Sequence, residues 1–147
     1  MAALNGVKID NFLRPRVKIY RGTFSSDNLC HETGLTVYNT DPHYLPGSHW
    51  IVVYISSDRQ TGEYFDSFGR PPNQNFTSYM NGHCRYWTHN RRQLQSVSSK
   101  LCGHYCLMYC ICRSRGMNVV DFSSRFVKCD TGFNDYVVRR FFRSASK

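Results

Sequence analysis

The pattern of apolar and polar positions predicts a small β-sheet in the first half of the chain. Residues 49–56 form an apolar, β-branched run with little alternation, which is typical of a central strand buried on both faces. Residues 34–40 predict another strand. Residues 57–62 have the composition of a hairpin turn, so residues 63–68 are expected to return as the antiparallel partner of the central strand. The motif GRPP then ends this partner.

A different periodicity appears in the second half of the chain, where apolar side chains recur at helical spacing. Residues 100–115 are apolar on two helical faces, so this helix should be buried. Gly116 follows the arginines of its last turn as a good C-cap. Shorter segments complete the prediction: helices in residues 73–82 and 133–142, and a helix or turn in residues 119–127. Residues 84–88 and 92–95 predict two short strands, or one bulged strand that includes both.

Together these segments predict one α+β domain over residues 1–147, with residues 1–19 as a candidate N-terminal arm. We expect a mixed, mainly antiparallel sheet packed against the central helix. No apolar run reaches the roughly 18 residues that a transmembrane helix needs. The first ten residues also contain no apolar segment long enough for a signal peptide.

Seven cysteines raise the question of disulfides and metal binding. An odd number in a chain without a secretory signal favours a reduced, intracellular protein over a disulfide scaffold. The chain has no C-x-x-C pair. Helical spacing would place Cys102, Cys106 and Cys110 in a line instead of around a tetrahedron, so we expect no metal site.

Cys102 occupies a position in which a cysteine can act as a nucleophile. It lies in the first turn of the predicted central helix, with Ser98 or Ser99 as the expected N-cap. There the unpaired backbone N–H groups and the positive end of the helix dipole favour a thiolate over a thiol. From this stretch alone, a buried core cysteine is an equally good interpretation, so both stay open.

Two upstream residues favour the nucleophile. His49 begins the central strand and Asp66 lies near the end of its partner, so antiparallel pairing brings both to one edge of the sheet. A histidine can serve as the base for a thiol, and an acid can hold the imidazole in the required tautomer. Taken singly, either residue could be structural, and other histidines are available for the same role: His31, His43, His83, His89 and His104.

Three motifs occur in an order shared with a known family. They are Gly47-x-His49-Trp50, the sequence YFDSFG over residues 64–69, and Gln95 seven residues before Cys102-Gly103. In this order and spacing they resemble the adenain family, the cysteine proteases of adenoviruses and of related virus-like DNA transposons. The SUMO-deconjugating proteases share the order. The resemblance runs from about Tyr20 to the C-terminus and implies a papain-like cysteine protease architecture of the adenain type.

The resemblance implies a role for each matching position. Cys102 would be the nucleophile, His49 its base, and Asp66 the acid that orients the imidazole. The Gln95 side chain and the Cys102 backbone N–H would stabilise the oxyanion. Gly47, Trp50 and Gly103 would bind substrate, with Trp50 walling the cleft. Adenoviral members carry glutamate where this chain has Asp66, and they are longer after the nucleophile helix.

The implied function is that of a cysteine endopeptidase that cleaves viral or transposon structural precursors during particle maturation, at sites with small or glycine residues around the scissile bond. Its chemistry would need no metal or cofactor. We expect a monomer in the host nucleus or virion, with precursor proteins as partners and no membrane association. Two alternatives stay open: an isopeptidase acting on SUMO-like or ubiquitin-like modifiers, and a catalytically inactive, basic nucleic-acid-binding module.

The charge of the chain bears on its partners. Lysine and arginine number 19 against 10 acidic residues, which gives a net charge of +9 at pH 7. Such an excess favours non-specific contact with DNA, although a basic surface without a specific partner explains it equally well. The resemblance implies DNA as a cofactor. It also implies an activating peptide disulfide-linked to Cys84, eighteen residues before Cys102. A buried free cysteine is the alternative for Cys84.

Overall fold

A mixed β-sheet forms the centre of the protein. The computed structural model describes the backbone of residues 1–41 and 49–145, and the side chains of this range up to residue 143. In this part of the chain the strands lie in the order β1-β2-β3-β4-β5. The three middle strands are antiparallel, and each edge strand is parallel to its neighbour. The strands are β1 (Tyr20–Ser25), β2 (Gly34–Asn39), β3 (Trp50–Ile55), β4 (Thr61–Phe65) and β5 (Tyr86–His89).

The strand β3 is central and covered on both faces, as its continuous apolar run predicts. Successive side chains of a strand point to opposite faces of the sheet. Ile51 and Val53 pack into the apolar cluster beside the helix α2 (Gln74–His83). Val52 packs into a second cluster around the helix α3 (Cys102–Ser114). Burial on both sides removes the polar–apolar alternation of a half-exposed strand.

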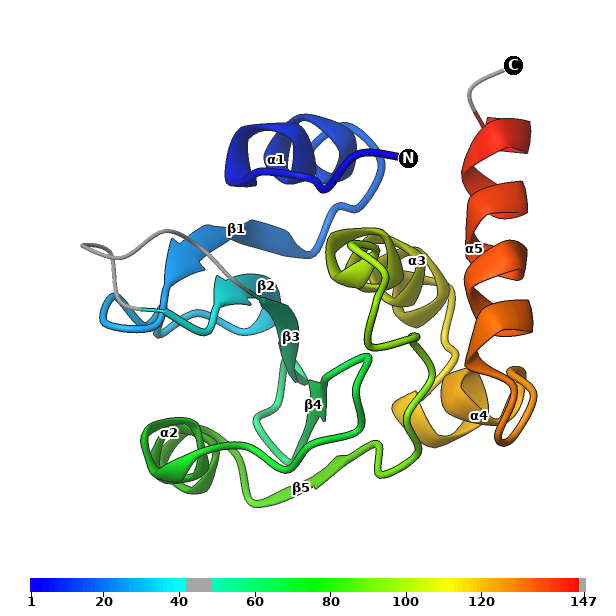
Figure 1. The fold of residues 1–147 in the computed structure, drawn as a ribbon. Coiled ribbons are helices and arrows are strands. Elements are labelled where there is room, and N and C mark those ends of the chain that lie inside the picture. Colours follow the sequence, from blue (N-terminus) through cyan, green and yellow to red (C-terminus); the bar gives the residue numbers. More distant parts are fainter. Residues whose placement is uncertain (42–48, 146–147) are drawn as a thin grey trace.

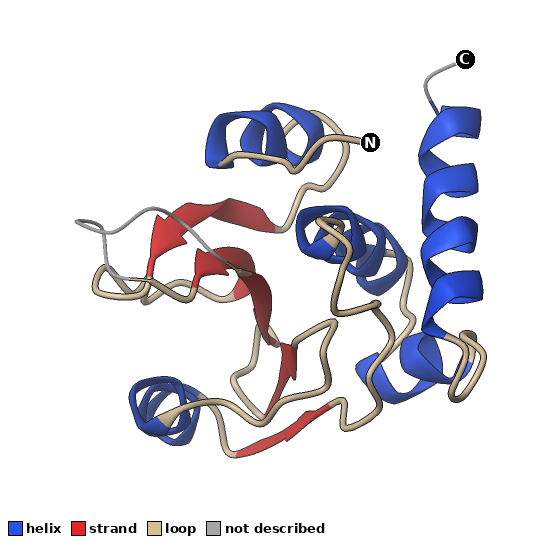
Figure 2. Ribbon diagram, viewed as in Figure 1, coloured by secondary structure: helices blue, strands red, loops and turns tan. Residues whose placement is uncertain are grey.

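The helices are divided unequally between the two faces of the sheet (Figure 1). The helix α3 covers one face together with α4 (Val119–Ser124) and α5 (Thr131–Ala145), and α2 lies on the other. Figure 2 shows the strands as a layer between these groups of helices. The helix α1 (Gly6–Leu13) packs against both β1 and α3. No helix in the described part of the chain is long and apolar enough to cross a membrane.

The local sequence signals located most elements, missed one strand and predicted one strand that is absent. All of the helices predicted after residue 70 are confirmed, and so is the mixed α+β class. Residues 92–95 are not a strand, because the backbone N–H groups of Leu94 and Gln95 donate to the Ser67 carbonyl at 2.9 and 3.1 Å. Residues 20–25 form an edge strand that the pattern did not predict. Edge strands depend on a partner elsewhere in the chain, here β2, more than on local propensity.

The helix α3 begins at Cys102 itself. Its N-cap is Leu101, which makes no side-chain hydrogen bond to the helix. The expectation that Ser98 or Ser99 caps this helix is therefore wrong. No side chain therefore caps the first-turn N–H groups, and the backbone N–H of Gly103 in this turn interacts with the Cys102 thiol instead.

Candidate active site

The sheet brings His49 and Asp66 together. In the antiparallel pairing of β3 with β4, Val52 lies opposite Phe65. His49 directly precedes β3 and Asp66 directly follows β4, so both reach the same edge. His49 Nε2 lies 2.7 Å from Asp66 Oδ1, in an ion pair that is almost completely buried. The juxtaposition expected from the hairpin is thus present in the structure.

Asp66 is held in place by backbone and side-chain hydrogen bonds. Its Oδ1 also accepts the backbone N–H of Phe68 at 2.8 Å. Asn90 clamps its backbone, because Asn90 Oδ1 accepts the Asp66 N–H at 3.0 Å and Asn90 Nδ2 donates to the Asp66 carbonyl at 2.6 Å. Asn90 is 3% exposed. Sequence reasoning missed this positioning residue, because nothing local distinguishes it from an asparagine in a turn.

The imidazole of His49 has one nitrogen occupied and one available. Nε2 interacts with Asp66, which leaves the buried Nδ1 as the nitrogen that can interact with the Cys102 thiol. The ring stacks on Phe68, with centroids 4.9 Å apart. Burial by itself lowers the pKa of His49, but the Asp66 carboxylate and the Cys102 thiol together raise it to about 9. The protonated imidazole is therefore favoured next to the thiol.

Cys102 is the first residue of α3 and interacts with His49. Burial by itself raises the pKa of its thiol. The His49 imidazole and the backbone N–H groups of Trp50 and Gly103 outweigh this effect, so the pKa is lowered from its ordinary value. These are the conditions that favour a thiolate. Cys106 and Cys110, on the same helix, are fully buried and burial raises their pKa values, so they are core cysteines.

Gln95 lies in the same site and is 1% exposed, so it is a buried residue. Its Oε1 accepts the hydroxyl of Ser67 at 2.6 Å. Its Nε2 donates to the Ser99 carbonyl at 3.0 Å. These two contacts fix the orientation of the amide, and the amide nitrogen carries a second hydrogen. Gln95 therefore has a donor to offer to a group bound near Cys102.

His49, Gln95 and Cys102 line one cavity of about 470 Å³, and Asp66 lies behind His49 outside its lining. Trp50, expected to wall the cleft, lines it, whereas Gly103 is buried behind Trp50 and Leu4. Gly47, also expected to bind substrate, lies outside the described residues. Sequence reasoning missed the contribution of the N-terminus. The residues that line the cavity are Ala3, Leu4, His49, Trp50, Phe68, Gln95, Val97, Ser99, Lys100 and Cys102.

Cys84 lies away from this cavity, beside β5. It is 7% exposed, and its Sγ donates to the Met80 carbonyl at 3.3 Å. Burial raises the pKa of its thiol. An added Cβ on Gly62 would lie 2.6 Å from Cys84 Sγ, so the thiol is closely packed. An activating peptide could reach it only if this packing opened, and the disulfide implied by the family resemblance stays a prediction.

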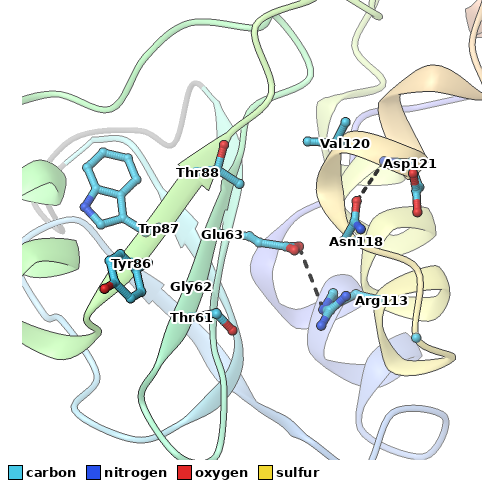
Figure 3. Close-up of a pocket in the computed structure, with 11 residues that line it drawn as sticks. Thr61, Gly62, Glu63, Tyr86, Trp87, Thr88, Arg113, Asn118, Val120 and Asp121 are labelled. Atoms are coloured by element: carbon cyan, nitrogen blue, oxygen red, sulfur yellow. Dashed lines mark hydrogen bonds and ion pairs between the residues drawn. The ribbon is translucent and has the colours of Figure 1, made fainter.

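A second cavity of about 600 Å³ lies between β4, β5 and the end of α3 (Figure 3). Within it Glu63 Oε1 lies 3.8 Å from Arg113 Nε and accepts the backbone N–H of Val119 at 3.0 Å. It also accepts the hydroxyl of the buried Tyr109. No cysteine or histidine is among its lining residues in the described structure. Glu63 thus ties the sheet to α3 and α4, a structural role.

Comparison with solved structures identifies proteins of the same fold. The ASFV pS273R protease matches with a TM-score of 0.68 and 20% identity, over 93% of this chain and 66% of the other. Its selenomethionine form matches with a TM-score of 0.51 and 23% identity, over 68% of this chain and 42% of the other. The SUMO protease Ulp1 with an oxidised catalytic cysteine has a TM-score of 0.47 and 16% identity, over 99% and 80% of the two chains, too low a score to support an inference.

The chain therefore has a cysteine protease fold, the one seen in the ASFV pS273R protease, and spans about two thirds of that protein's length. This confirms the architecture implied by the motif resemblance. No protein-family model and no curated protein matches the sequence. The likeness is one of fold, and the functions of the individual site residues rest on the geometry above.

Proposed function

We propose that this protein is a cysteine endopeptidase with Cys102 as nucleophile, His49 as base and Asp66 as the orienting acid. The observation that carries the proposal is the buried His49–Asp66 pair next to a thiol of lowered pKa at a helix start. An unassisted thiol is mostly protonated at neutral pH. A neighbouring imidazolium and a helix N-terminus lower its pKa and so raise the fraction of thiolate. The motif resemblance and the shared protease fold support the same assignment.

The proposed reaction follows from these positions. The Cys102 thiolate attacks the carbonyl carbon of a peptide bond, and negative charge develops on the carbonyl oxygen. The second hydrogen of Gln95 Nε2 and the Cys102 backbone N–H donate to that oxygen, each contributing about 3 kcal/mol of transition-state stabilisation. The His49 imidazolium protonates the departing amine. The neutral imidazole then takes a proton from water, whose oxygen attacks the thioester carbonyl. The C–S bond breaks, the carboxylic acid product leaves, and the Cys102 thiolate and the His49 imidazolium are restored.

We further propose that the substrates are structural precursor proteins of a virus or a virus-like transposon. The support is the order of the motifs around His49, Asp66, Gln95 and Cys102, together with the fold likeness to the ASFV pS273R protease. A Gly-Gly-linked fluorogenic modifier, compared with a short unmodified peptide, distinguishes this endopeptidase from an isopeptidase. Faster turnover of the modifier would favour the isopeptidase.

The decisive experiment combines peptide turnover with active-site labelling. Cys102→Ser and His49→Ala should each abolish cleavage of a fluorogenic peptide while leaving the circular dichroism spectrum unchanged. Cys112→Ser is the matched control, because this half-buried cysteine lies near the other end of the same helix. A peptide-aldehyde probe should bind at Cys102 in the wild type. Near-normal turnover in either site variant would remove the catalytic assignment.

A further inference from the structure

The N-terminal residues 1–4 form a segment, here called the strap, whose last two residues reach the candidate active site. Ala3 and Leu4 line the same cavity as His49 and Cys102. Directly after the strap, Asn5 caps α1 by accepting the Lys8 N–H at 2.8 Å. Because α1 packs against both β1 and α3, the end of the strap is anchored to the body of the protein. The strap is therefore a defined wall of the cavity.

The strap is tied to the cavity through Trp50. The indole Nε1 of Trp50 donates to the Leu4 carbonyl at 3.1 Å. The backbone N–H of the same tryptophan helps to lower the pKa of the Cys102 thiol. One residue thus contacts the strap with its side chain and the nucleophile with its backbone. This bond fixes the position of the Leu4 backbone beside the thiol.

The contact between the strap and α3 is close. A Cβ added to Gly103 would lie 3.1 Å from Leu4 Cβ and 3.5 Å from Trp50 Cδ1. The first of these distances is shorter than most real Cβ contacts, so only glycine fits here without displacing the strap. Leu4 thus fills the space next to the helix turn that carries Cys102. A bulky group approaching the thiol from this side meets the strap.

We infer that the strap is a specificity-determining wall: Leu4, fixed by Trp50, limits the size of the group that can lie beside Cys102 Sγ. The inference rests on the proposed function in that the natural group would be the substrate side chain next to the scissile bond. Small side chains fit beside the strap in the cavity that Phe68 and Val97 also line, and large ones are excluded. The limit is steric, so it acts on any electrophile that reaches the thiol.

The test measures access to Cys102 with two reagents that share one reactive group. Iodoacetamide is small, whereas iodoacetanilide carries an additional phenyl ring. Their rates of reaction at Cys102 are followed by mass spectrometry of the peptide that contains it. Deleting residues 2–4 leaves Met1 before Asn5 and so keeps the N-cap of α1. We expect the iodoacetanilide-to-iodoacetamide rate ratio to rise about tenfold in the deletion variant.

A control variant and a second site variant distinguish a steric effect of the strap from a general loosening of the structure around Cys102. Val7→Ala alters a side chain of α1 that is 68% exposed, and it should leave the ratio unchanged. Gly103→Ala should displace Leu4 and raise the ratio in the full chain. In the deletion variant, Gly103→Ala should not change the rate ratio further, because Leu4, with which the new methyl group would clash, is absent. The pH profile of iodoacetamide labelling should be the same in the wild type and the deletion variant, since the deletion leaves His49 and the backbone N–H groups of Trp50 and Gly103 in place.

An unchanged or lower ratio in the deletion variant would overturn the inference. If that variant does not fold, Gly103→Ala and Leu4→Ala in the full chain decide the question in the same assay. Peptide turnover is measured separately with glycine or phenylalanine beside the scissile bond. A raised labelling ratio without any turnover would sustain the wall and refute the proposed protease. Turnover with an unchanged ratio would sustain the protease and refute the wall.

Discussion

The carboxylate of Asp66 should account for the raised pKa of His49, and Asp66→Asn tests this. The pKa of His49 is about 9, against an ordinary value of 6.5. This difference corresponds to about 3 kcal/mol in favour of the imidazolium. Two groups raise the pKa, the Asp66 carboxylate and the Cys102 thiol, while burial opposes them. The comparison is therefore best made in a Cys102→Ala background, in which only the carboxylate remains.

In that background, the His49 ring protons are titrated by NMR with Asp66 or with asparagine at position 66. With the carboxylate present, the midpoint should lie above 6.5. With asparagine it should fall below 6.5, because burial then acts unopposed. Asparagine at this position can still accept the Phe68 N–H through its side-chain oxygen. The substitution therefore removes charge with little change in the local backbone.

The same comparison predicts how stability depends on pH. A histidine whose pKa is raised on folding stabilises the folded state fully below its unfolded pKa of about 6.5, and this contribution is lost as pH rises through the folded pKa. The aspartate form should thus lose stability between about pH 6.5 and the folded midpoint, and the asparagine form should not. Identical NMR midpoints for the two forms would refute a controlling role for the carboxylate.

Three further predictions follow from the site, the core and the charge. Iodoacetamide at about pH 6 should modify Cys102 before the other cysteines, as measured by peptide mass spectrometry. His49→Ala should remove this preference, and equal labelling of all exposed cysteines in the wild type would contradict an activated thiol. Tyr109→Phe should lower the free energy of unfolding by about 1–3 kcal/mol in urea titrations, because the buried Glu63 loses a donor. As a control, Tyr136→Phe at an exposed position should change the free energy of unfolding by less than about 0.5 kcal/mol. Equal losses in the two variants would contradict the structural role of Glu63. We also expect the protein to bind DNA independently of sequence, with an affinity that falls as salt rises, and DNA to accelerate peptide cleavage. Replacing Arg139, Arg140 and Arg143 by glutamine should weaken binding equally on two unrelated duplexes in fluorescence anisotropy. An affinity that does not change with salt would contradict this prediction.

Much of the candidate site could be predicted from the sequence because its parts are carried by regular elements. The apolar run of β3 and the helical spacing after Leu101 place His49 at the start of a strand and Cys102 in the first turn of a helix. A tight hairpin leaves little freedom in register, so His49 and Asp66 had to meet. Periodicity and turn length were sufficient for these positions because they are local properties of the chain.

Other features depend on contacts between segments that are far apart in sequence. Asn90 holds the backbone of Asp66 across 24 positions, and Trp50 holds Leu4 across 46. No local pattern marks either pair, because a single asparagine or leucine has the same appearance in a turn, an arm or a site. Edge strand β1 likewise becomes a strand only by pairing with β2. Such hydrogen bonds and close contacts form only after chain folding supplies the partner.

The sequence by itself determined the α+β class, the central strand, the buried helix and the order of the four candidate residues His49, Asp66, Gln95 and Cys102. Only the tertiary structure decided which groups surround them. It buried Gln95 with a fixed amide, replaced the expected serine cap of α3 by Leu101, and brought Leu4 into the cavity of the nucleophile. The physical reason is that apolar periodicity selects elements and their buried faces, whereas the size and polarity of a cavity depend on which distant segments come to line it.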